Sequence, residues 1–370
     1  MSRLSTNRYK NIETVYIERH NLTELFITAQ KSPEKNIDLF LRQLSKTLSG
    51  QDANIIRMLV FGSISGFNRF IREIKNIFGR VEWPITYIKD KKCQEQNITG
   101  LQIHAVTGVG TKTIYLDEKP SARLFEDDSA IYCAVGNIHP RDRSKSPEEQ
   151  THDTLMRIER VLREAGMGMK NIIRTWFFND NILQWYDKFN RVRTDFYSKR
   201  GIFDSLIPAS TGIGGANPQN VLLTADAIAI QLKNKSMSIS EVPSPLQNPA
   251  CDYGSSFSRA VELKMNNCVY LYISGTASIN KNGATTHIKN LCAQIDNTMQ
   301  IVEAILKSKR MDYSNVTRSI AYFKFNNDID SFNKYLEKYG LSSSRVLTVQ
   351  NDVCRDELLF EIEIDAFSIH

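Results

Sequence analysis

The sequence predicts an α/β (α+β) fold made of three similar units, each with a mixed sheet and helices, arranged around a shared centre. The first observation is an apolar stretch that begins Asn-x-x-Arg and recurs at residues 54–61, 171–178 and 315–322. Each copy is rich in β-branched and aromatic residues, which favour strands. The second observation is an amphipathic helical pattern before and after every copy. Because helices on one side of a small sheet leave its other face unburied, we expect the three sheets to pack together with the helices outside.

Apolar residues at spacings of three and four predict two helices in each unit. The helices before the repeated strand are expected at residues 37–48, 155–165 and 291–306, and those after it at residues 67–74, 185–196 and 332–339. Gly166 directly follows one of these patterns, at a position where glycine commonly ends a helix.

Each unit is also expected to open and to close with a strand. The opening strands are predicted at Leu25–Thr28, Ala130–Val135 and Val269–Ser274, and the closing strands at Leu101–Val106, Val221–Ile230 and Leu358–Phe367. Two stretches that contain proline and serine, Glu118–Asp128 and Val242–Ser255, are expected to link the units. The predicted domains therefore cover residues 1–125, 126–245 and 246–370, with ligand sites where neighbouring units meet.

The composition is typical of a folded protein. Of the 370 residues, 41% are hydrophobic and 24% are charged, which argues against intrinsic disorder. No apolar run approaches the ~18–20 residues that a membrane span needs. The N-terminal residues show no apolar signal segment. We therefore expect a cytoplasmic protein with no membrane partner.

Charge and cysteine usage narrow the function classes further. The formal net charge of +6 is spread along the chain without a basic stripe, so no nucleic-acid partner is expected. A modest positive balance suits a small anionic substrate. The six cysteines stand singly, and no His, Cys or carboxylate group has metal-ligand spacing. No metal and no cofactor are therefore expected.

Acidic residues alternate along the closing strand of the third unit, at Glu361, Glu363 and Asp365. Alternate residues of a strand share one face. For Glu363 and Asp365 the favoured interpretation is the solvated face of an antiparallel sheet. Glu361 comes first, and the corresponding strand of the second unit, Leu222–Ala227, has no matching Glu. Because a carboxyl group in a partly apolar cleft keeps its proton near neutral pH, Glu361 is the candidate proton donor.

The segment Pro208–Pro218 is rich in glycine and small residues and contains Ser210, Thr211 and Gly212. It matches neither a Walker A loop nor a GxGxxG motif. Two interpretations stay open: the backbone amides bind a carboxylate or phosphate, or the segment is a tight connection between strands. Gly275–Ala277 is a second small-residue stretch, which is either a ligand contact or a plain strand end.

Arginine side chains are candidates for binding carboxylates through paired hydrogen bonds. The candidates are Arg174, Arg193, Arg259, Arg345 and Arg355. Tyr186 lies seven residues before Arg193, so the two share one face of the expected helix. Tyr253 belongs to the hydroxyl-rich segment Asp252–Arg259.

The third unit resembles the YjgF/Rid family of small α/β proteins. The resemblance rests on Ile273–Ala277, the helix Leu291–Leu306 and Glu361–Glu363. Members of that family are trimers with sites at subunit junctions. The resemblance implies three YjgF/Rid-like units fused in one chain, a pseudo-trimer that we expect to be a monomer. The first unit has only the repeat pattern and is the divergent one.

Longer stretches resemble the chorismatase family over roughly residues 125–370. They are Arg174–Phe177, Trp185–Arg193, Pro208–Gly215, Ser244–Gln247 and Asp252–Ala260. Chorismatases cleave the enolpyruvyl ether of chorismate to pyruvate and a hydroxybenzoate or a cyclohexadiene diol, with neither metal nor organic cofactor. The resemblance therefore implies an enzyme with chorismate as its substrate.

The resemblance also implies roles for individual residues. Glu361 matches the acid that protonates the enolpyruvyl methylene carbon. Cys354 stands seven residues earlier, where a Cys is associated with the hydroxybenzoate branch; its other interpretation is a packed strand-end residue. The expected product is 3-hydroxybenzoate, with 4-hydroxybenzoate as a possible companion. The expected substrate-binding residues are Arg174, Tyr186, Arg193, Ser210, Thr211, Gly212, Tyr253, Arg259, Gly275, Thr276, Ala277, Arg345 and Arg355.

Three functions stay open. The first is a chorismatase, giving either 3-hydroxybenzoate or, by hydrolysis, a trans-dihydroxycyclohexadiene carboxylate. The second is a Rid-type enamine/imine deaminase, in which Arg345 binds a substrate carboxylate and Glu361 places the water. The third is a metabolite-binding protein on the same fold. The deaminase hypothesis leaves Trp185–Arg193 and Ser210–Gly215 unexplained.

Overall fold

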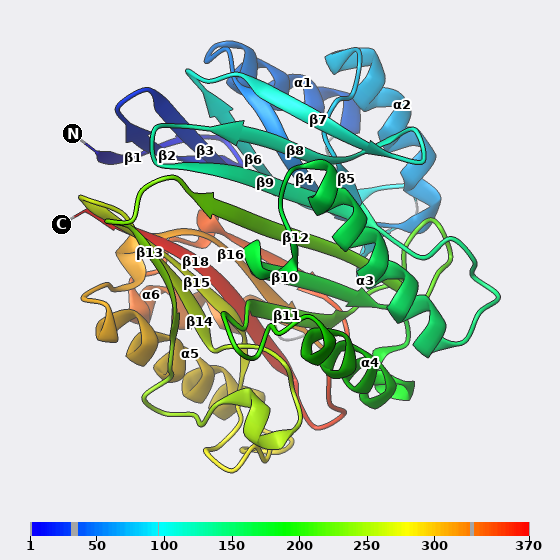
Figure 1. Cartoon of the computed structure of the whole chain (residues 1–370), viewed down its shortest axis with the longest axis vertical. Coiled ribbons are helices and arrows are strands. Elements are labelled where there is room, and N and C mark those ends of the chain that lie inside the picture. The colour runs from blue at the N-terminus through cyan, green and yellow to red at the C-terminus, as the bar shows by residue number, and fades with distance from the viewer. Residues whose placement is uncertain (1, 31–35, 95, 326–328, 370) are drawn as a thin grey trace.

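The computed structural model describes residues 2–30, 36–94, 96–325 and 329–369. Its strands form three six-stranded mixed sheets, each built from one consecutive part of the chain. Figure 1 shows the sheets gathered in the middle of the molecule, with the helices of each unit on the outside. The predicted α+β architecture of three units is confirmed.

The first sheet has the order β1-β2-β3-β6-β4-β5, the second β11-β10-β12-β9-β8-β7, and the third β13-β14-β15-β18-β16-β17. The first unit consists of β1 (Arg3–Tyr9), β2 (Ile12–Arg19), β3 (Leu22–Gln30), α1 (Ile37–Ser49), β4 (Asn54–Gly62), α2 (Phe67–Phe78), β5 (Ile85–Lys89) and β6 (Ile98–Thr107). The second consists of β7 (Thr111–Leu116), β8 (Lys119–Glu126), β9 (Ala130–Ile138), α3 (Pro147–Glu164), β10 (Ile172–Asn179), α4 (Tyr186–Lys199), β11 (Ala209–Gly214) and β12 (Leu223–Leu232). The third consists of β13 (Ser238–Val242), β14 (Ala260–Lys264), β15 (Cys268–Ala277), α5 (Leu291–Ser308), β16 (Val316–Phe323), α6 (Ile329–Tyr339), β17 (Val346–Gln350) and β18 (Phe360–Ile369).

The closing strand of every unit lies in the middle of its sheet. It pairs antiparallel with the opening strand on one side and with the repeated Asn-x-x-Arg strand on the other, as in β15-β18-β16. The repeated strand then pairs in parallel with the strand that follows the second helix, as β10 does with β11. A parallel pair needs such a crossover, and the helix supplies it.

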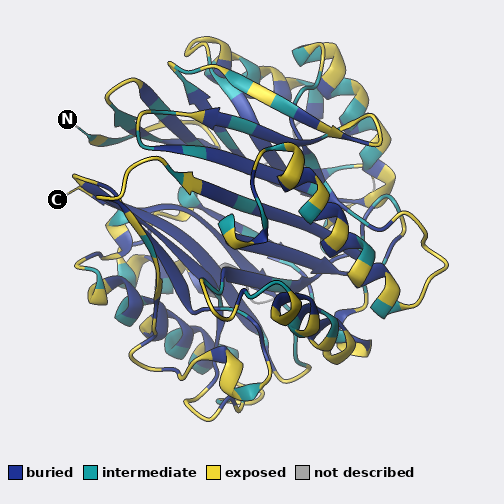
Figure 2. Cartoon of the chain, viewed as in Figure 1, coloured by how far each residue is buried: buried dark blue, intermediate teal, exposed yellow. Residues whose placement is uncertain are grey.

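The core has two layers, because each sheet buries both of its faces. Apolar residues between sheet and helices form one cluster in each unit, and these clusters include Leu41, Leu162 and Met299 on the helices. Two further clusters contain residues of all three units, where the inner faces of the sheets meet. Figure 2 shows this as dark strands inside and exposed outer helix surfaces. The inner faces are therefore where the units exchange side chains.

The observed elements correct several expectations. Residues 118–128 are not a linker, since β8 lies within them, and β7 and β8 pair with β9 in the second sheet. The sheets change at residues 108–110 and 233–237, so the strands of the second and third units begin before the predicted boundaries at 125/126 and 245/246. Residues 242–255 are not a linker between units either, because they lead from the end of β13 towards β14 within the third sheet. The strands of the hairpin β7–β8 are only partly buried, and apolar and polar residues do not alternate regularly along them. The sequence pattern therefore did not indicate this hairpin. Among the described residues, no helix is long and apolar enough to cross a membrane.

Candidate active site

Glu361 lies on β18 at the junction of the second and third units. It pairs across the sheet with Ala277 on β15 and with Tyr322 on β16. Glu361 is 4% exposed, and Glu363 and Asp365 are also buried. The predicted solvated face is therefore wrong for Glu363 and Asp365, because the sheet of another unit covers that face.

Gly275 makes room for the Glu361 carboxyl group. The register of β15 and β18 shifts between Ile273 and Thr276, so a bulge is formed at this place. A Cβ atom at Gly275 would lie 2.0 Å from Oε1 of Glu361 and 3.2 Å from Cγ2 of Thr211. Only glycine fits here without displacing the carboxyl group. The predicted grouping of Gly275, Thr211 and Glu361 in one place is what the structure has.

Burial keeps the Glu361 carboxyl group protonated near neutral pH. Loss of solvent raises the pKa of Glu361 to about 8, and the negative charge of Glu363 adds to this rise, while Arg174 opposes it. A carboxylic acid with such a pKa holds its proton at pH 7 and can give it to a substrate.

The segment around Ser210 and Thr211 is a strand, β11, rather than a loop or a connection. It runs parallel to β10 at the edge of the second sheet and faces β15 of the third unit. A Cβ atom at Gly212 would lie 2.8 Å from the hydroxyl oxygen of Tyr186, so this glycine makes room for the tyrosine of α4. Burial raises the pKa of the Tyr186 phenol, with contributions from Cys354 and Glu361, so Tyr186 is neutral.

Arg193 projects from α4 towards the same junction and is 1% exposed. Its Nη2 donates to Oδ1 of Asn190 at 2.7 Å, and its Nη1 donates to Oγ of Ser210 at 3.4 Å. Its Nε has no hydrogen-bond partner among the described residues. A buried guanidinium group with free donors is suited to a carboxylate of a ligand.

The loop before β18 completes the site with Cys354 and Arg355. Cys354 is half-buried, and the surrounding protein, together with the charge of Glu361, raises the pKa of its thiol to about 12. The guanidinium carbon of Arg355 lies 5.7 Å from the ring centroid of Tyr253, and that of Arg259 lies 5.4 Å from it. Arg259 also donates to the carbonyl of Asn248 at 2.8 Å.

These residues form one cluster of a buried acid, neutral phenol and thiol groups, and three arginines. We call this cluster the junction site; its members are Tyr186, Arg193, Ser210, Thr211, Gly212, Tyr253, Arg259, Gly275, Cys354, Arg355 and Glu361. Some of its members, such as Tyr186 and Tyr253, are half-buried. Every member of the junction site is among the residues that the sequence analysis named as candidates.

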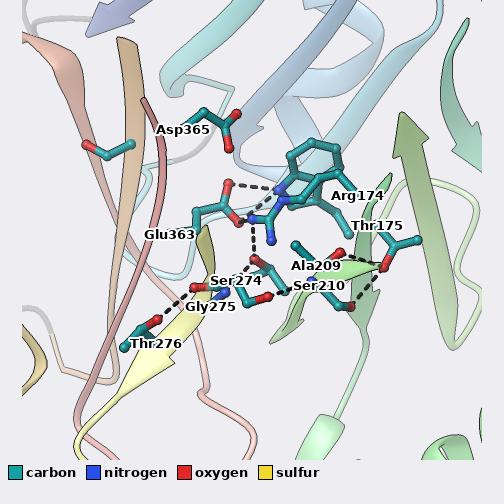
Figure 3. Close-up of polar contacts among 12 residues, drawn as sticks. Arg174, Thr175, Ala209, Ser210, Ser274, Gly275, Thr276, Glu363 and Asp365 are labelled. Atoms are coloured by element: carbon teal, nitrogen blue, oxygen red, sulfur yellow. Dashed lines mark hydrogen bonds and ion pairs between the residues drawn. The ribbon is translucent and has the colours of Figure 1, made fainter. Parts of the chain in front are cut away.

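Three predicted residues have other surroundings. Arg174 is fully buried behind the junction site, where its Nη2 donates to Thr211 Oγ1 at 2.8 Å and to Glu363 Oε2 at 3.2 Å (Figure 3). The Thr276 hydroxyl donates to the carbonyl of Ser274 at 2.8 Å. Ala277 is buried opposite Glu361. Their predicted role in binding substrate directly stays a prediction.

Arg345 lies at a different junction, between the third and first units, and this corrects its grouping with the other arginines. Its Nε lies 3.2 Å from Oε1 of Glu13, and its Nη1 donates to the carbonyls of Ser314 and Val316 at 3.0 and 2.8 Å. Glu13 belongs to the first unit, so this ion pair links the two units, whereas the two carbonyls belong to the third unit itself. The donors of Arg345 are thus engaged away from Glu361.

The other two junctions have no acid in the position of Glu361. Tyr322 pairs with Glu361, and the residues at the same place in the other repeats, Phe61 and Phe178, pair with Gly100 and Thr224. A Cβ atom at Gly100 would lie 2.7 Å from Cδ1 of Leu347, so an apolar side chain of the third unit fills that junction. Among the described residues, only the junction of the second and third units has an acid at this position.

Sequence reasoning missed the polar cluster at the centre of the molecule. The repeated Asn-x-x-Arg pattern held the signal, because its arginines, Arg57, Arg174 and Arg318, all meet at Trp176. Their guanidinium carbons lie 4.0, 4.7 and 5.4 Å from the Trp176 ring centroid.

Among the residues described, no group of three or more His, Cys, Asp or Glu is placed to hold a metal ion.

Comparisons with known proteins agree with this architecture. The family model described as endoribonuclease L-PSP matches residues 135–231. Among solved structures, a crystal structure of a chorismatase aligns with a TM-score of 0.66 at 16% identity, covering 93% of this chain and 98% of that one. The Rid-family protein YyfA from Yersinia pestis (20% identity, TM-score 0.30) and the YjgF gene product from E. coli (16%, 0.28) are covered almost completely, over 98% and 97% of their lengths, but cover only 35% and 34% of this chain. No curated protein sequence matches the chain.

The protein is therefore an α+β protein of three fused units. The match to the endoribonuclease L-PSP family model lies in the second unit. Over 93% of its length, the chain has a fold similar to that of a chorismatase. The resemblance noted from the sequence motifs is confirmed at the level of the fold.

Proposed function

We propose that the chain is a chorismatase that cleaves the enolpyruvyl ether of chorismate at the junction site. The observation that carries this proposal is Glu361, a buried carboxyl group with a pKa near 8, lying among the arginines of the junction site. The fold shared with a chorismatase supports the same conclusion.

The chemistry begins with a proton from Glu361. The π electrons of the enolpyruvyl double bond form the new C–H bond at the methylene carbon, and the ether-bearing carbon becomes an oxocarbenium ion. Water or the ring hydroxyl then adds to this carbon, and a proton returns to the Glu361 carboxylate. After addition of water, collapse of the hemiketal breaks the ether bond and releases pyruvate and the ring diol. After addition of the ring hydroxyl, the ether bond and the ring C–O bond of that hydroxyl oxygen both break, so pyruvate leaves with this oxygen. A proton then passes from a ring carbon to the remaining ring oxygen, which makes the ring aromatic. In the hydroxybenzoate route no water is consumed overall, since pyruvate and hydroxybenzoate together contain all the atoms of chorismate.

Arg193, Arg259 and Arg355 supply the positive charge for the two carboxylates of chorismate. Arg193 is buried next to β11, whereas Arg259 and Arg355 flank the Tyr253 ring. Guanidinium groups bind carboxylates in a fixed planar geometry, so they orient the substrate as well as attract it.

Replacing the proton donor tests the proposal. Glu361→Gln keeps the size of the side chain but has no acidic proton, so we expect pyruvate release to fall about 100-fold or more, as for loss of a general acid. The matched control is Glu357→Gln, four residues earlier and exposed, which should keep the wild-type rate. Equal rates for wild type and Glu361→Gln would refute the mechanism.

The product is proposed to be 3-hydroxybenzoate, because of Cys354. Burial, with a smaller contribution from the charge of Glu361, raises the pKa of its thiol to about 12, so the thiol is neutral. Cys354→Ala should keep pyruvate release and shift the second product towards a dihydroxycyclohexadiene carboxylate. An unchanged product ratio, resolved by mass and retention time, would remove Cys354 from the branch choice.

The match to the endoribonuclease L-PSP model keeps a Rid-type deaminase as a second candidate. That activity was expected to use Arg345, which is engaged with Glu13 at another junction. Release of ammonia from imines derived from amino acids would favour the deaminase. Turnover of chorismate, without activity on these imines, would favour the chorismatase.

A further inference from the structure

Glu363 is the anion nearest to Glu361 along the chain, and it is fully buried. The two residues lie on the same face of β18, separated by one residue. The Glu363 carboxylate accepts hydrogen bonds from Trp176 Nε1 at 2.8 Å, from Arg174 Nη2 at 3.2 Å and from Arg318. It is therefore held as a carboxylate by two cations and a neutral donor.

The charges at the centre of the molecule balance without Glu361. Three buried arginines face three buried carboxylates there: Arg57, Arg174, Arg318, Asp226, Glu363 and Asp365. Arg57 lies 3.8 Å from Asp226, and Arg318 lies 2.8 Å from Asp365. An ionised Glu361 would add a negative charge that this group does not match.

The central cluster is linked to the junction site by hydrogen bonds. Arg174 donates to Oγ1 of Thr211, and the same oxygen accepts from the backbone N–H of Gly275 at 3.1 Å (Figure 3). Gly275 in turn lies against the Glu361 carboxyl group. The arginine that holds Glu363 thus also fixes the backbone beside the proton donor.

We propose that Glu363 is a positioning residue that keeps Glu361 loaded with its proton by placing a fixed negative charge on the same face of β18. This inference rests on the proposed function for its role in turnover. It gives two of the repeated arginines a role: Arg174 and Arg318 donate hydrogen bonds to Glu363 and keep it ionised, so that Glu361 stays neutral. It also involves the first unit, since Oε1 of Gln102 on β6 accepts from Nε of Arg318 at 2.7 Å.

Apart from Glu363, the groups that face Glu361 are neutral or would be unchanged by a substitution of Glu363. The titratable and charged groups whose fields reach it are Glu363 from β18, Arg174 from β10, Tyr186 from α4, Tyr322 from β16 and Cys354 from the preceding loop. Arg193 faces Tyr186 and Cys354 from α4. Because burial raises the pKa of both phenols and of the thiol, Glu363 is the one fixed anion among these groups.

The test is the pH dependence of turnover in Glu363→Gln. Removing the anion lowers the pKa of Glu361, so the alkaline limb of the kcat profile should move down by about one pH unit, which is a tenfold loss at pH 9 with little change at pH 6. The matched control is Asp226→Asn, which removes a buried carboxylate from the Arg57 side of the same cluster and should leave the limb in place. Equal shifts in both variants, or no shift in Glu363→Gln, would overturn the proposal.

A second variant guards against a folding failure. Glu363→Gln leaves Arg174 and Arg318 short of one negative charge, whereas Glu363→Gln/Arg318→Gln keeps the cluster neutral and should show the same acidic shift. A readout that needs no turnover is the infrared band of the protonated Glu361 carboxyl, identified by its absence in Glu361→Gln. If this band titrates at lower pH in the variants while wild type leaves chorismate intact, the proposed function fails and the inference stands. If the band titrates as in wild type, the inference fails.

Discussion

At the scale of single residues, the site depends on two glycines that face reactive groups. Gly275 leaves space for the Glu361 carboxyl group and Gly212 leaves space for the Tyr186 hydroxyl. Neither glycine has a positive φ, so these positions require glycine for the absence of a side chain and not for the backbone conformation. Substitution by alanine therefore tests space alone.

Gly275→Ala should disable the enzyme. The new Cβ atom would lie 2.0 Å from Oε1 of Glu361, so the carboxyl group must move, and overpacking of this kind costs about 1–3 kcal/mol of stability. We expect the rate of pyruvate release to fall at least about tenfold, since misplacement of a reacting group by ~1 Å costs about 100-fold. Gly110→Ala, where no atom lies within 4 Å of the added Cβ, should behave as wild type. A fully active Gly275→Ala would show that Glu361 does not need this position.

Burial of Glu361 also makes stability depend on pH. Its pKa is raised from 4.5 to about 8, so the folded state binds more protons than the unfolded state between these values. The stabilisation is complete below pH 4.5 and is progressively lost as the pH rises through 8. Denaturant unfolding should show that wild type loses stability relative to Glu361→Gln between pH 5 and 8.5, with a ceiling of about 5 kcal/mol. Parallel pH curves for the two proteins would contradict the raised pKa.

At the scale of elements, the sequence predicted what periodicity can show. The six expected helices are all present, because each places an apolar stripe on its sheet. The repeated strands are also present, because burial on both faces makes them largely apolar runs. The central closing strands are present as well, although acidic and apolar residues alternate along β18. β11 was not predicted as a strand, since its two glycines and its alanine disfavour strands, and the partner strand β10 and the facing β15 explain it.

The start of α3 offers a test of local stability apart from the chemistry. Ser146 accepts a hydrogen bond from the Glu149 backbone N–H, and the Glu149 side chain accepts one from the Ser146 N–H, a capping box. Ser146→Ala should lower the free energy of unfolding by about 1 kcal/mol. The rate of pyruvate release at 25 °C should not change, because α3 contributes no residue to the junction site. A loss of activity without a loss of stability would mean that α3 has a role in the site.

At the scale of the whole molecule, the junctions between units decide where chemistry is possible. The acids of β18 were misread as a solvated face because their partners, Arg174 and Arg318, come from strands that are 189 and 45 residues away from Glu363 in the chain. No local pattern shows such distant pairing. The same reason explains Arg345, whose partner Glu13 is 332 residues away.

Arg345 should prove to be a link between units rather than a substrate ligand. Its pairing with Glu13 is nearly buried, and removing one partner of a buried pair costs about 3–5 kcal/mol. Arg345→Ala should therefore lower the thermal or denaturant midpoint and leave kcat and KM for chorismate unchanged in the folded protein. A large rise in KM with normal stability would return Arg345 to the binding site.

The central claim is that the junction site turns over chorismate with Glu361 as the proton donor. The most direct measurement is incubation of the purified wild-type protein and Glu361→Gln with chorismate and no added metal, with the products resolved by mass and retention time. We predict equal amounts of pyruvate and 3-hydroxybenzoate from wild type and almost none from the variant. Intact chorismate in both samples, or equal turnover in both, would contradict the claim.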